Sequence, residues 1–323
     1  ALVLIFVMLV VKLLINFAGL DIIDISEYLG GKFLQILIGI LCIVYLLVEA
    51  SFLTRMFSKN LFLAYFNDYP ISFIIFLFLF VVVVANLIGK KSIIKTNTIV
   101  VPIALFSILF TFIFVADLLR VERSLPILAD GASTIFLTGA SNIFAFNGLF
   151  FLFFVSPLLN KKQDMPKIAF ASTLICGIFL ILSITALVFA FSDIYSVIRI
   201  SPLYFIIINS KLSSFLERPE IIFIFIWTLS LMSFLSIAVM FILNIFKKMT
   251  NMKKVKNLSV AVCTIIFTIS LLIDNVFTLE KVANAFYKYG TLVLVFGVFT
   301  LVLIGANIKK KMLQKRQNIN YKE

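Results

Sequence analysis

The chain has 323 residues, of which 63% are hydrophobic and only 13% charged, with a mean hydropathy of +1.18 and a formal net charge of +13. Soluble domains are about half apolar and about a quarter charged, so the composition excludes them and predicts an all-α polytopic membrane protein. The basic residues form short blocks between continuous apolar runs. This pattern is typical of membrane topology rather than of nucleic-acid binding, and we expect no nucleic-acid partner.

A membrane-spanning helix requires about 20 apolar residues, and nine stretches of the chain meet or approach this length. The first and the eighth are the shortest. In chain order, the predicted spans are Ala1–Phe17, Phe33–Met56, Ile71–Gly89, Thr98–Leu119, Ile135–Leu159, Lys167–Phe191, Ile221–Phe246, Leu258–Ile273 and Tyr289–Ile308.

The basic residues are unevenly divided between the two sets of alternate loops. One set, which includes the C-terminal tail, holds nineteen of the 28 basic residues when the adjoining span ends are counted, and the other set holds nine. Lysine and arginine are enriched on the cytoplasmic side of membrane proteins. We therefore expect the C-terminus and its basic tail, residues 309–323, in the cytoplasm, where they favour anionic lipid of the bilayer.

The number of spans predicts an internal repeat. Nine spans and a cytoplasmic C-terminus place Ala1 outside, in mid-helix and without a preceding signal peptide. We therefore expect a missing first span and a complete protein of ten spans. Two units of five spans are inverted relative to each other, as in many transporters. Within one integral membrane domain, residues 1–119 are then the remainder of the first repeat and residues 135–308 the second.

The span Ile135–Leu159 contains a cluster of small and polar residues in its first half. The cluster consists of Gly139, Ser141, Asn142, Asn147 and Gly148. Small residues also allow membrane helices to pack closely, which explains the glycines alone. The whole cluster favours a helix that unwinds within the bilayer, where its backbone groups and helix ends bind a ligand. We predict a site for an amino acid here, with Phe144 and Phe146 either as walls of the pocket or as ordinary packing residues.

Glu49 is the one acidic residue well inside a predicted span. Intramembrane acids are unfavourable and are therefore candidates for function. One interpretation gives Glu49 a role in the ligand vestibule, facing the ammonium group of the ligand or a proton. The other is structural, with Glu49 reaching the interface or pairing with Arg55.

Two further features surround the predicted site. Ser230, Ser233 and Ser236 share one face of their span and suit either helix packing or a cavity lining, in which Ser233 is the candidate ligand-binding residue. The segment Ser201–Glu220 is predicted to form an amphipathic helix on the outer face. Pro219 suits the first turn of the helix that follows.

Several residue types that catalysis and metal binding require are missing from the sequence. The chain has no histidine, and its three cysteines lie in apolar runs without metal-binding spacing. No hydrolase or metalloprotease motif is present. We expect no metal, no cofactor and no enzymatic activity.

Three groups of residues resemble one known family in their order and spacing. They are Leu125-Pro126-Ile127-Leu128 with Gly131 and Gly139; Phe144-Ala145-Phe146-Asn147-Gly148 with Pro157 and Lys161-Lys162; and Phe215-Leu216-Glu217-Arg218-Pro219-Glu220 with Trp227. The chain resembles the GerAB-like spore germination permeases, which are B subunits of germinant receptors in the amino acid–polyamine–organocation superfamily. It departs from some relatives after Gly148, where they carry an acidic residue and this chain has Leu149 and Phe150.

The resemblance implies a ten-helix, LeuT-like permease fold and a receptor function in the spore inner membrane. Such a receptor senses an amino acid or a similar nutrient, assembles with an A subunit and a lipoprotein C subunit, and triggers ion release and germination. An active amino acid or cation symporter or exchanger on the same fold is the alternative, because both functions require the same cavity.

Overall fold

The computed structural model describes residues 2–115, 119–124, 131–159, 161–190, 219–272 and 276–320. All regular elements in these ranges are helices, which confirms the all-α polytopic class. Seven helices are long and apolar enough to cross a membrane, and two shorter apolar helices cover Leu2–Phe17 and Leu258–Leu272. Each of the nine predicted spans overlaps one of these helices.

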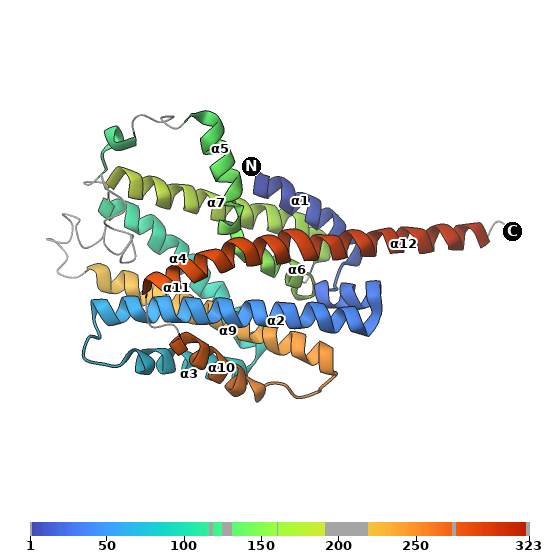
Figure 1. The fold of residues 1–323 in the computed structure, drawn as a ribbon, viewed down its shortest axis with the longest axis horizontal. Coiled ribbons are helices and arrows are strands. Elements are labelled where there is room, and N and C mark those ends of the chain that lie inside the picture. The colour runs from blue at the N-terminus through green and yellow to red at the C-terminus, as the bar shows by residue number, and fades with distance from the viewer. Residues whose placement is uncertain are drawn as a thin grey trace.

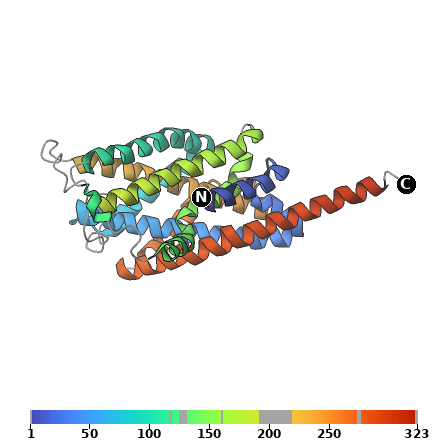
Figure 2. The same cartoon turned by 90° about the horizontal axis from the view of Figure 1, so that it is seen from above.

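Most of the helices lie side by side along the long axis of the molecule, whereas α5 runs across it (Figures 1 and 2). In chain order they are α1 (Leu2–Leu14), α2 (Ile22–Ala64), α3 (Ile71–Ile88), α4 (Lys90–Val115), α5 (Ala132–Ser141), α6 (Leu152–Val155), α7 (Met165–Ala190), α9 (Pro219–Thr250), α10 (Leu258–Leu272), α11 (Val276–Ala285) and α12 (Thr300–Asn320). Helices α2 and α9 are central, because each contacts the other and also α3 and α10. The C-terminal part of α12 projects beyond the bundle (Figure 1).

Helix α2 is longer than the predicted span Phe33–Met56 and contains a break. Asp21 caps its N-terminus by accepting hydrogen bonds from the backbone N–H groups of Ile23 and Asp24. Gly30 and Gly31 then leave helical geometry, and Gly31 has a φ of 69°, which glycine adopts readily. The short first segment of α2 is thereby separated from the long segment that carries Glu49.

Ion pairs attach this first segment to the neighbouring helices. The Lys248 ammonium, near the end of α9, lies 2.6 Å from a carboxylate oxygen of Asp21 and 2.6 Å from one of Asp24. Burial raises the pKa of the Asp21 carboxyl above its ordinary value, and the Lys248 charge opposes that rise. Lys309 on α12 donates to the Tyr28 carbonyl at 2.7 Å. Both α9 and α12 therefore hold the start of α2 in place.

Replacing Lys248 with alanine should destabilise the protein, because Asp21 and Asp24 would lose their shared cation while remaining close together. Hydrogen bonds to charged groups contribute about 1.5–3 kcal/mol each, and partial exposure of Lys248 reduces the effect here. We expect a fall in the thermal unfolding temperature of the detergent-solubilised protein. Lys247→Ala changes an exposed lysine of the same turn and should leave that temperature nearly unchanged. Equal effects of the two substitutions would contradict the importance of the ion pairs.

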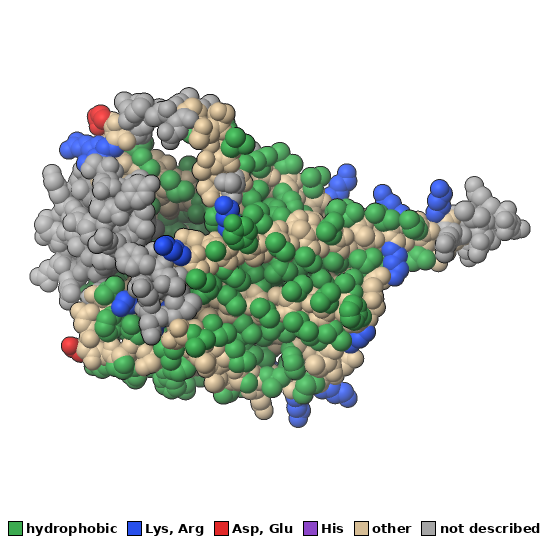
Figure 3. Space-filling model, viewed as in Figure 1, with side chains coloured by type: hydrophobic (Ala, Val, Ile, Leu, Met, Phe, Trp, Pro, Cys, Tyr) green, Lys and Arg blue, Asp and Glu red, His purple; other side chains and the backbone are tan. Residues whose placement is uncertain are grey.

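The surface agrees with an integral membrane protein. Hydrophobic side chains cover the length of the bundle on the face shown in Figure 3, and basic side chains gather around the end from which α12 projects. Lys256, after α9, donates to the carbonyls of Leu87 and Ile88 at the end of α3. Asp68 precedes the start of α3, so the loop that contains Lys256 and the loop that contains Asp68 lie at opposite ends of that helix.

The predicted orientation can be tested with single cysteines at these two ends. In a background in which the three native cysteines are alanine, Lys253→Cys should be protected from an impermeant maleimide added outside intact cells, because the basic loops are expected in the cytoplasm. Asp68→Cys should be labelled under the same conditions. The opposite labelling pattern would reverse the predicted topology.

The predicted amphipathic outer segment Ser201–Glu220 lies outside the described residues, apart from its last two positions. The described part of helix α9 starts at Pro219, so the position of this proline in the first turn stays a prediction. A proline is tolerated there because the first N–H groups of a helix have no partner within it.

Candidate functional site

The crossing formed by residues 132–158 is interrupted. Helix α5 ends at Ser141, and Asn142 has the non-helical angles φ −94° and ψ 18°. A 3₁₀ segment, η4 (Ile143–Phe151), follows and is itself broken at Phe146, where φ is −91° and ψ is 42°. The single turn α6 and the 3₁₀ turn η5 (Ser156–Leu158) complete the crossing. The predicted interruption of this crossing is therefore present, although the segment forms 3₁₀ turns with breaks at Asn142 and Phe146 and is not fully unwound.

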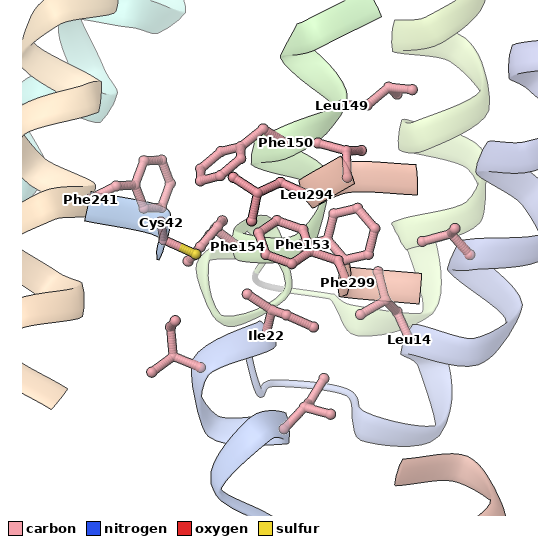
Figure 4. Close-up of a cluster of buried hydrophobic side chains, with 14 of the residues drawn as sticks. Leu14, Ile22, Cys42, Leu149, Phe150, Phe153, Phe154, Phe241, Leu294 and Phe299 are labelled. Carbon is pink, nitrogen blue, oxygen red and sulfur yellow. The ribbon is translucent and has the colours of Figure 1, made fainter. Parts of the chain in front are cut away.

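Aromatic packing holds the C-terminal half of this crossing. Phe150, Phe153 and Phe154 are fully or almost fully buried. Figure 4 shows them gathered with Leu294 and Phe299 of the last crossing, which spans Lys281–Lys315. The ring of Phe150 stacks on that of Phe154 with centroids 5.1 Å apart, and the ring of Phe153 lies 4.9 Å from that of Phe299. This aromatic core fixes the position of η4, to which Phe150 belongs.

A cavity of about 580 Å³ lies beside the interruption. Its described lining comes from α4, from η4 with α6 and the residues that follow, and from α7. Most of the lining side chains are apolar, and the polar ones are Asn147, Ser172, Thr173 and Ser183. A mainly apolar cavity with a few polar groups is the usual form of a small-molecule site.

Three of the predicted ligand-binding residues line this cavity, namely Phe146, Asn147 and Gly148. A Cβ atom added at Gly148 would meet no atom within 4 Å. Close packing therefore does not require glycine at this position, and the space beside Gly148 belongs to the cavity. Phe146, the residue with non-helical angles, supplies an aromatic wall.

Asn147 connects the cavity to Glu49. Its amide Nδ2 donates a hydrogen bond to Glu49 Oε1 at 3.0 Å, although the two residues are far apart in the sequence. Glu49 lies near the middle of the long segment of α2 and is only 2% exposed. The structure thus gives Glu49 an asparagine from the interrupted crossing as its hydrogen-bond partner, rather than Arg55 or the aqueous interface.

The remaining predicted site residues lie elsewhere. Gly139 is exposed on α5, and Asn142 is exposed at its end. Phe144 is half-buried in η4 but is not part of the cavity lining, and the side chain of Ser141 lies outside the described residues. The structure therefore divides the predicted cluster into an exposed part on α5 and at its end and a second part that lines the cavity.

Ser233 is also separate from the cavity. It is buried on α9, whereas no described lining residue of the cavity comes from α9. Its neighbours on the same face, Ser230 and Ser236, donate to carbonyls one turn earlier in their own helix at 2.8 and 2.7 Å. The Ser236 carbonyl accepts a hydrogen bond from Asn86 of α3. For this face, the structure supports the packing interpretation over the cavity interpretation.

Sequence analysis missed three polar residues near Glu49. Tyr45 lies one helical turn before Glu49, and its hydroxyl is 3.0 Å from Thr291 Oγ1. Tyr287, one turn before Thr291, packs against the cluster of Phe52 and Ala283, and Phe52 lies about one turn after Glu49 on α2. The spacing of Tyr45 and Glu49 was a usable signal, because residues four apart share a helix face. Within the described ranges, no group of three or more histidine, cysteine or acidic residues could hold a metal ion.

Comparison with known proteins identifies the family of this chain. No curated protein matches it. A family model described as "Spore germination protein" matches residues 1–277, which include the interrupted crossing, the cavity and Glu49. Because this match covers most of the chain, the chain belongs to the spore germination protein family of GerAB-like permeases that the sequence resembles.

Proposed function

We propose that this chain is the nutrient-sensing subunit of a germinant receptor. It binds an amino acid or a similar small molecule in the cavity beside the interrupted crossing and passes a conformational signal to partner subunits. The observation that carries the proposal is the Asn147–Glu49 hydrogen bond, which is part-buried and lies at the edge of that cavity. An acidic residue deep in a membrane protein is energetically unfavourable, and such residues are therefore candidates for function.

The chemistry of the cavity supports a small ligand with an apolar part and a polar head. The apolar walls favour burial of a hydrophobic side chain. The 3₁₀ backbone around Phe146 and the amide of Asn147 offer hydrogen-bonding groups for the polar head. Ligand contacts with this interrupted segment bias its geometry, and a bistable segment is what a receptor needs to convert binding into a signal.

The assembly and location of the receptor are part of the same proposal. Family membership supports an integral membrane location and a role in germination. We propose a LeuT-like fold of two inverted five-helix repeats in the spore inner membrane, with a cytoplasmic C-terminus, and assembly with an A and a C subunit. The chain acts without catalysing a covalent reaction.

An active symporter or exchanger is the second candidate function, because a buried acid beside a cavity also suits cation-coupled transport. Proteoliposomes that contain the intact protein distinguish the two. A receptor should bind a labelled amino acid saturably without accumulating it in the vesicle lumen. Concentrative uptake that depends on an ion gradient would establish the transporter instead, and absence of binding by any nutrient that triggers germination would refute both.

A further inference from the structure

The carboxylate of Glu49 has only one of its oxygens hydrogen-bonded. Oε1 accepts the bond from Asn147, whereas Oε2 is buried and has no hydrogen-bond partner within the described residues. The buried hydroxyl of Tyr287 is likewise without a partner in that part of the chain. Buried polar atoms in native proteins are nearly always hydrogen-bonded, and an exception indicates a bound water, ion or ligand group.

Polar side chains from three crossings lie around this carboxylate. Tyr45 and Glu49 share a face of α2, and Tyr45 is held to Thr291 by the 3.0 Å contact between their hydroxyls. Tyr287 shares a face of the last crossing with Thr291 and packs against the cluster of Phe52 and Ala283, and Phe52 lies about one turn after Glu49 on α2. Asn147 of η4 contributes the amide N–H that donates to Glu49. The group contains a carboxyl group, hydroxyls and an amide, and Glu49 is its one acidic residue.

The last crossing has an unusual backbone where it approaches this group. Residues Phe286–Gly290 and Leu292–Phe299 form π-helical turns instead of α-helical ones. Single π turns within helices are frequent at functional sites. A Cβ atom on Gly290 would lie 3.4 Å from the ring of Tyr45, which is an ordinary van der Waals contact, so the two helices pack directly against each other here.

Aromatic rings surround the group. The Tyr45 ring stacks between those of Phe150 and Phe286, with centroid distances of 4.9 and 5.1 Å. Phe52 meets Phe286 edge-on at 5.6 Å. These rings shield the carboxylate from lipid, and in such surroundings a negative charge attracts a cation far more strongly than it does in water. The faces of aromatic rings also favour a nearby cation.

We propose that Glu49, Asn147, Tyr45, Tyr287 and Thr291 form a subsite for one monovalent cation, which is either the ammonium group of an organic ligand or an alkali metal ion. Carboxylate and hydroxyl oxygens are suitable ligands for both, and the Asn147 amide holds the Glu49 carboxyl in place by its hydrogen bond. The inference rests on the proposed function in one respect, because Asn147 joins the subsite to the ligand cavity. Glu49 supplies the neutralising charge, and Tyr287 supplies an oxygen atom that otherwise remains unused.

Thermal unfolding of the purified full chain tests this subsite without any nutrient. At constant ionic strength, N-methylglucamine chloride is replaced stepwise by methylammonium, sodium or potassium chloride. A cation that binds only the folded protein raises the unfolding temperature as its concentration exceeds its Kd. We expect such a rise for the native chain and its loss in Glu49→Gln, which keeps the side-chain shape and removes the charge. Glu27→Gln, which removes an acid at the first segment of α2, should leave the rise intact.

The individual results distinguish the two sources of the cation. A rise with methylammonium alone supports the ammonium of an organic ligand, and a rise with sodium or potassium supports an alkali metal ion. Absence of a rise with all three salts, or an equal rise in Glu49→Gln, would overturn the subsite. If Glu49→Gln does not fold, Tyr287→Phe is the deciding variant. It should weaken cation binding about tenfold, so that a tenfold higher salt concentration gives the same rise in unfolding temperature. An unchanged half-saturating salt concentration would overturn the proposal.

The nutrient response is a separate measurement. If cation binding persists in a chain that responds to no nutrient, the receptor function is refuted and the subsite stands. If the nutrient response persists while the native chain binds no cation, the subsite is refuted and the receptor function stands.

Discussion

Asn147→Leu is expected to abolish the response of the receptor to its nutrient, or to raise the half-saturating concentration about tenfold to a hundredfold, while the protein still inserts in the membrane. The substitution removes the donor to Glu49 and leaves a buried carboxylate without the bond seen at 3.0 Å. An unsatisfied buried polar group costs about 1–3 kcal/mol. Each 1.4 kcal/mol lost from binding is a factor of ten. The measurement is the dose–response of germination in spores that carry the variant as their copy of this subunit.

Asn86→Leu is the matched control for this prediction. Asn86 is another asparagine of a predicted span and is itself buried, and its amide donates to the carbonyls of Val82 and Ser236 at 3.0 and 3.2 Å. It joins two helices but does not line the cavity. Its loss should lower stability by a comparable amount without a selective change in the dose–response. If Asn147→Leu inserts normally and responds like the native chain, Asn147 does not belong to the ligand site.

The helical architecture was predictable because the necessary signals are local. Long apolar runs specify helices that cross a bilayer, and each predicted span overlaps a helix of the structure. The interruption of the fifth crossing was predictable for the same reason, since small and polar residues in an apolar run disfavour a regular lipid-facing helix. The break at Gly30–Gly31 was missed because it lies just before the predicted span, although two adjacent glycines are a recognised signal of a helix end.

The composition of the site was only partly predictable, because it depends on contacts between distant segments. The sequence identified Glu49 and Asn147 separately, but their hydrogen bond joins two crossings that only the folded structure brings together. Tyr287 and Thr291 carry no local signal, since a tyrosine and a threonine in an apolar helix are ordinary. In the other direction, proximity along the chain grouped Gly139 and Asn142 with Asn147, whereas the end of α5 separates them in space.

The hydrogen-bonding capacity of the side chains explains why the serines of α9 are packing residues whereas Glu49 has a partner on another crossing. A serine in a membrane helix can satisfy its hydroxyl by donating to the carbonyl one turn earlier, as Ser230 and Ser236 do. Such residues need no partner on another helix, so their pattern is a weak indication of a cavity. A carboxylate has no donor of its own when ionised. Glu49 must therefore find donors or a cation on other elements, which makes an intramembrane acid the stronger signal.

Cys176→Trp is expected to abolish the nutrient response by filling the cavity. Cys176 lies on α7 and lines the cavity opposite the interrupted crossing. An indole there occupies space that the ligand needs, while the free volume of about 580 Å³ limits the strain on the surrounding helices. The half-saturating nutrient concentration should rise at least about tenfold, which corresponds to 1.4 kcal/mol of lost binding. Cys176→Ala should respond normally, because the size of the side chain matters and its thiol does not.

Ile175→Trp separates the effect of the cavity from the effect of a large side chain on α7. Ile175 is the preceding residue of the same helix, is 42% exposed and does not line the cavity. Its replacement adds an indole on the outer surface of the bundle, where lipid can accommodate it, so both insertion and the nutrient response should be retained. If Cys176→Trp also responds at native nutrient concentrations, the ligand does not occupy this cavity. A ligand that acts through Asn147 would then have to bind on the side of the interrupted crossing that faces Glu49.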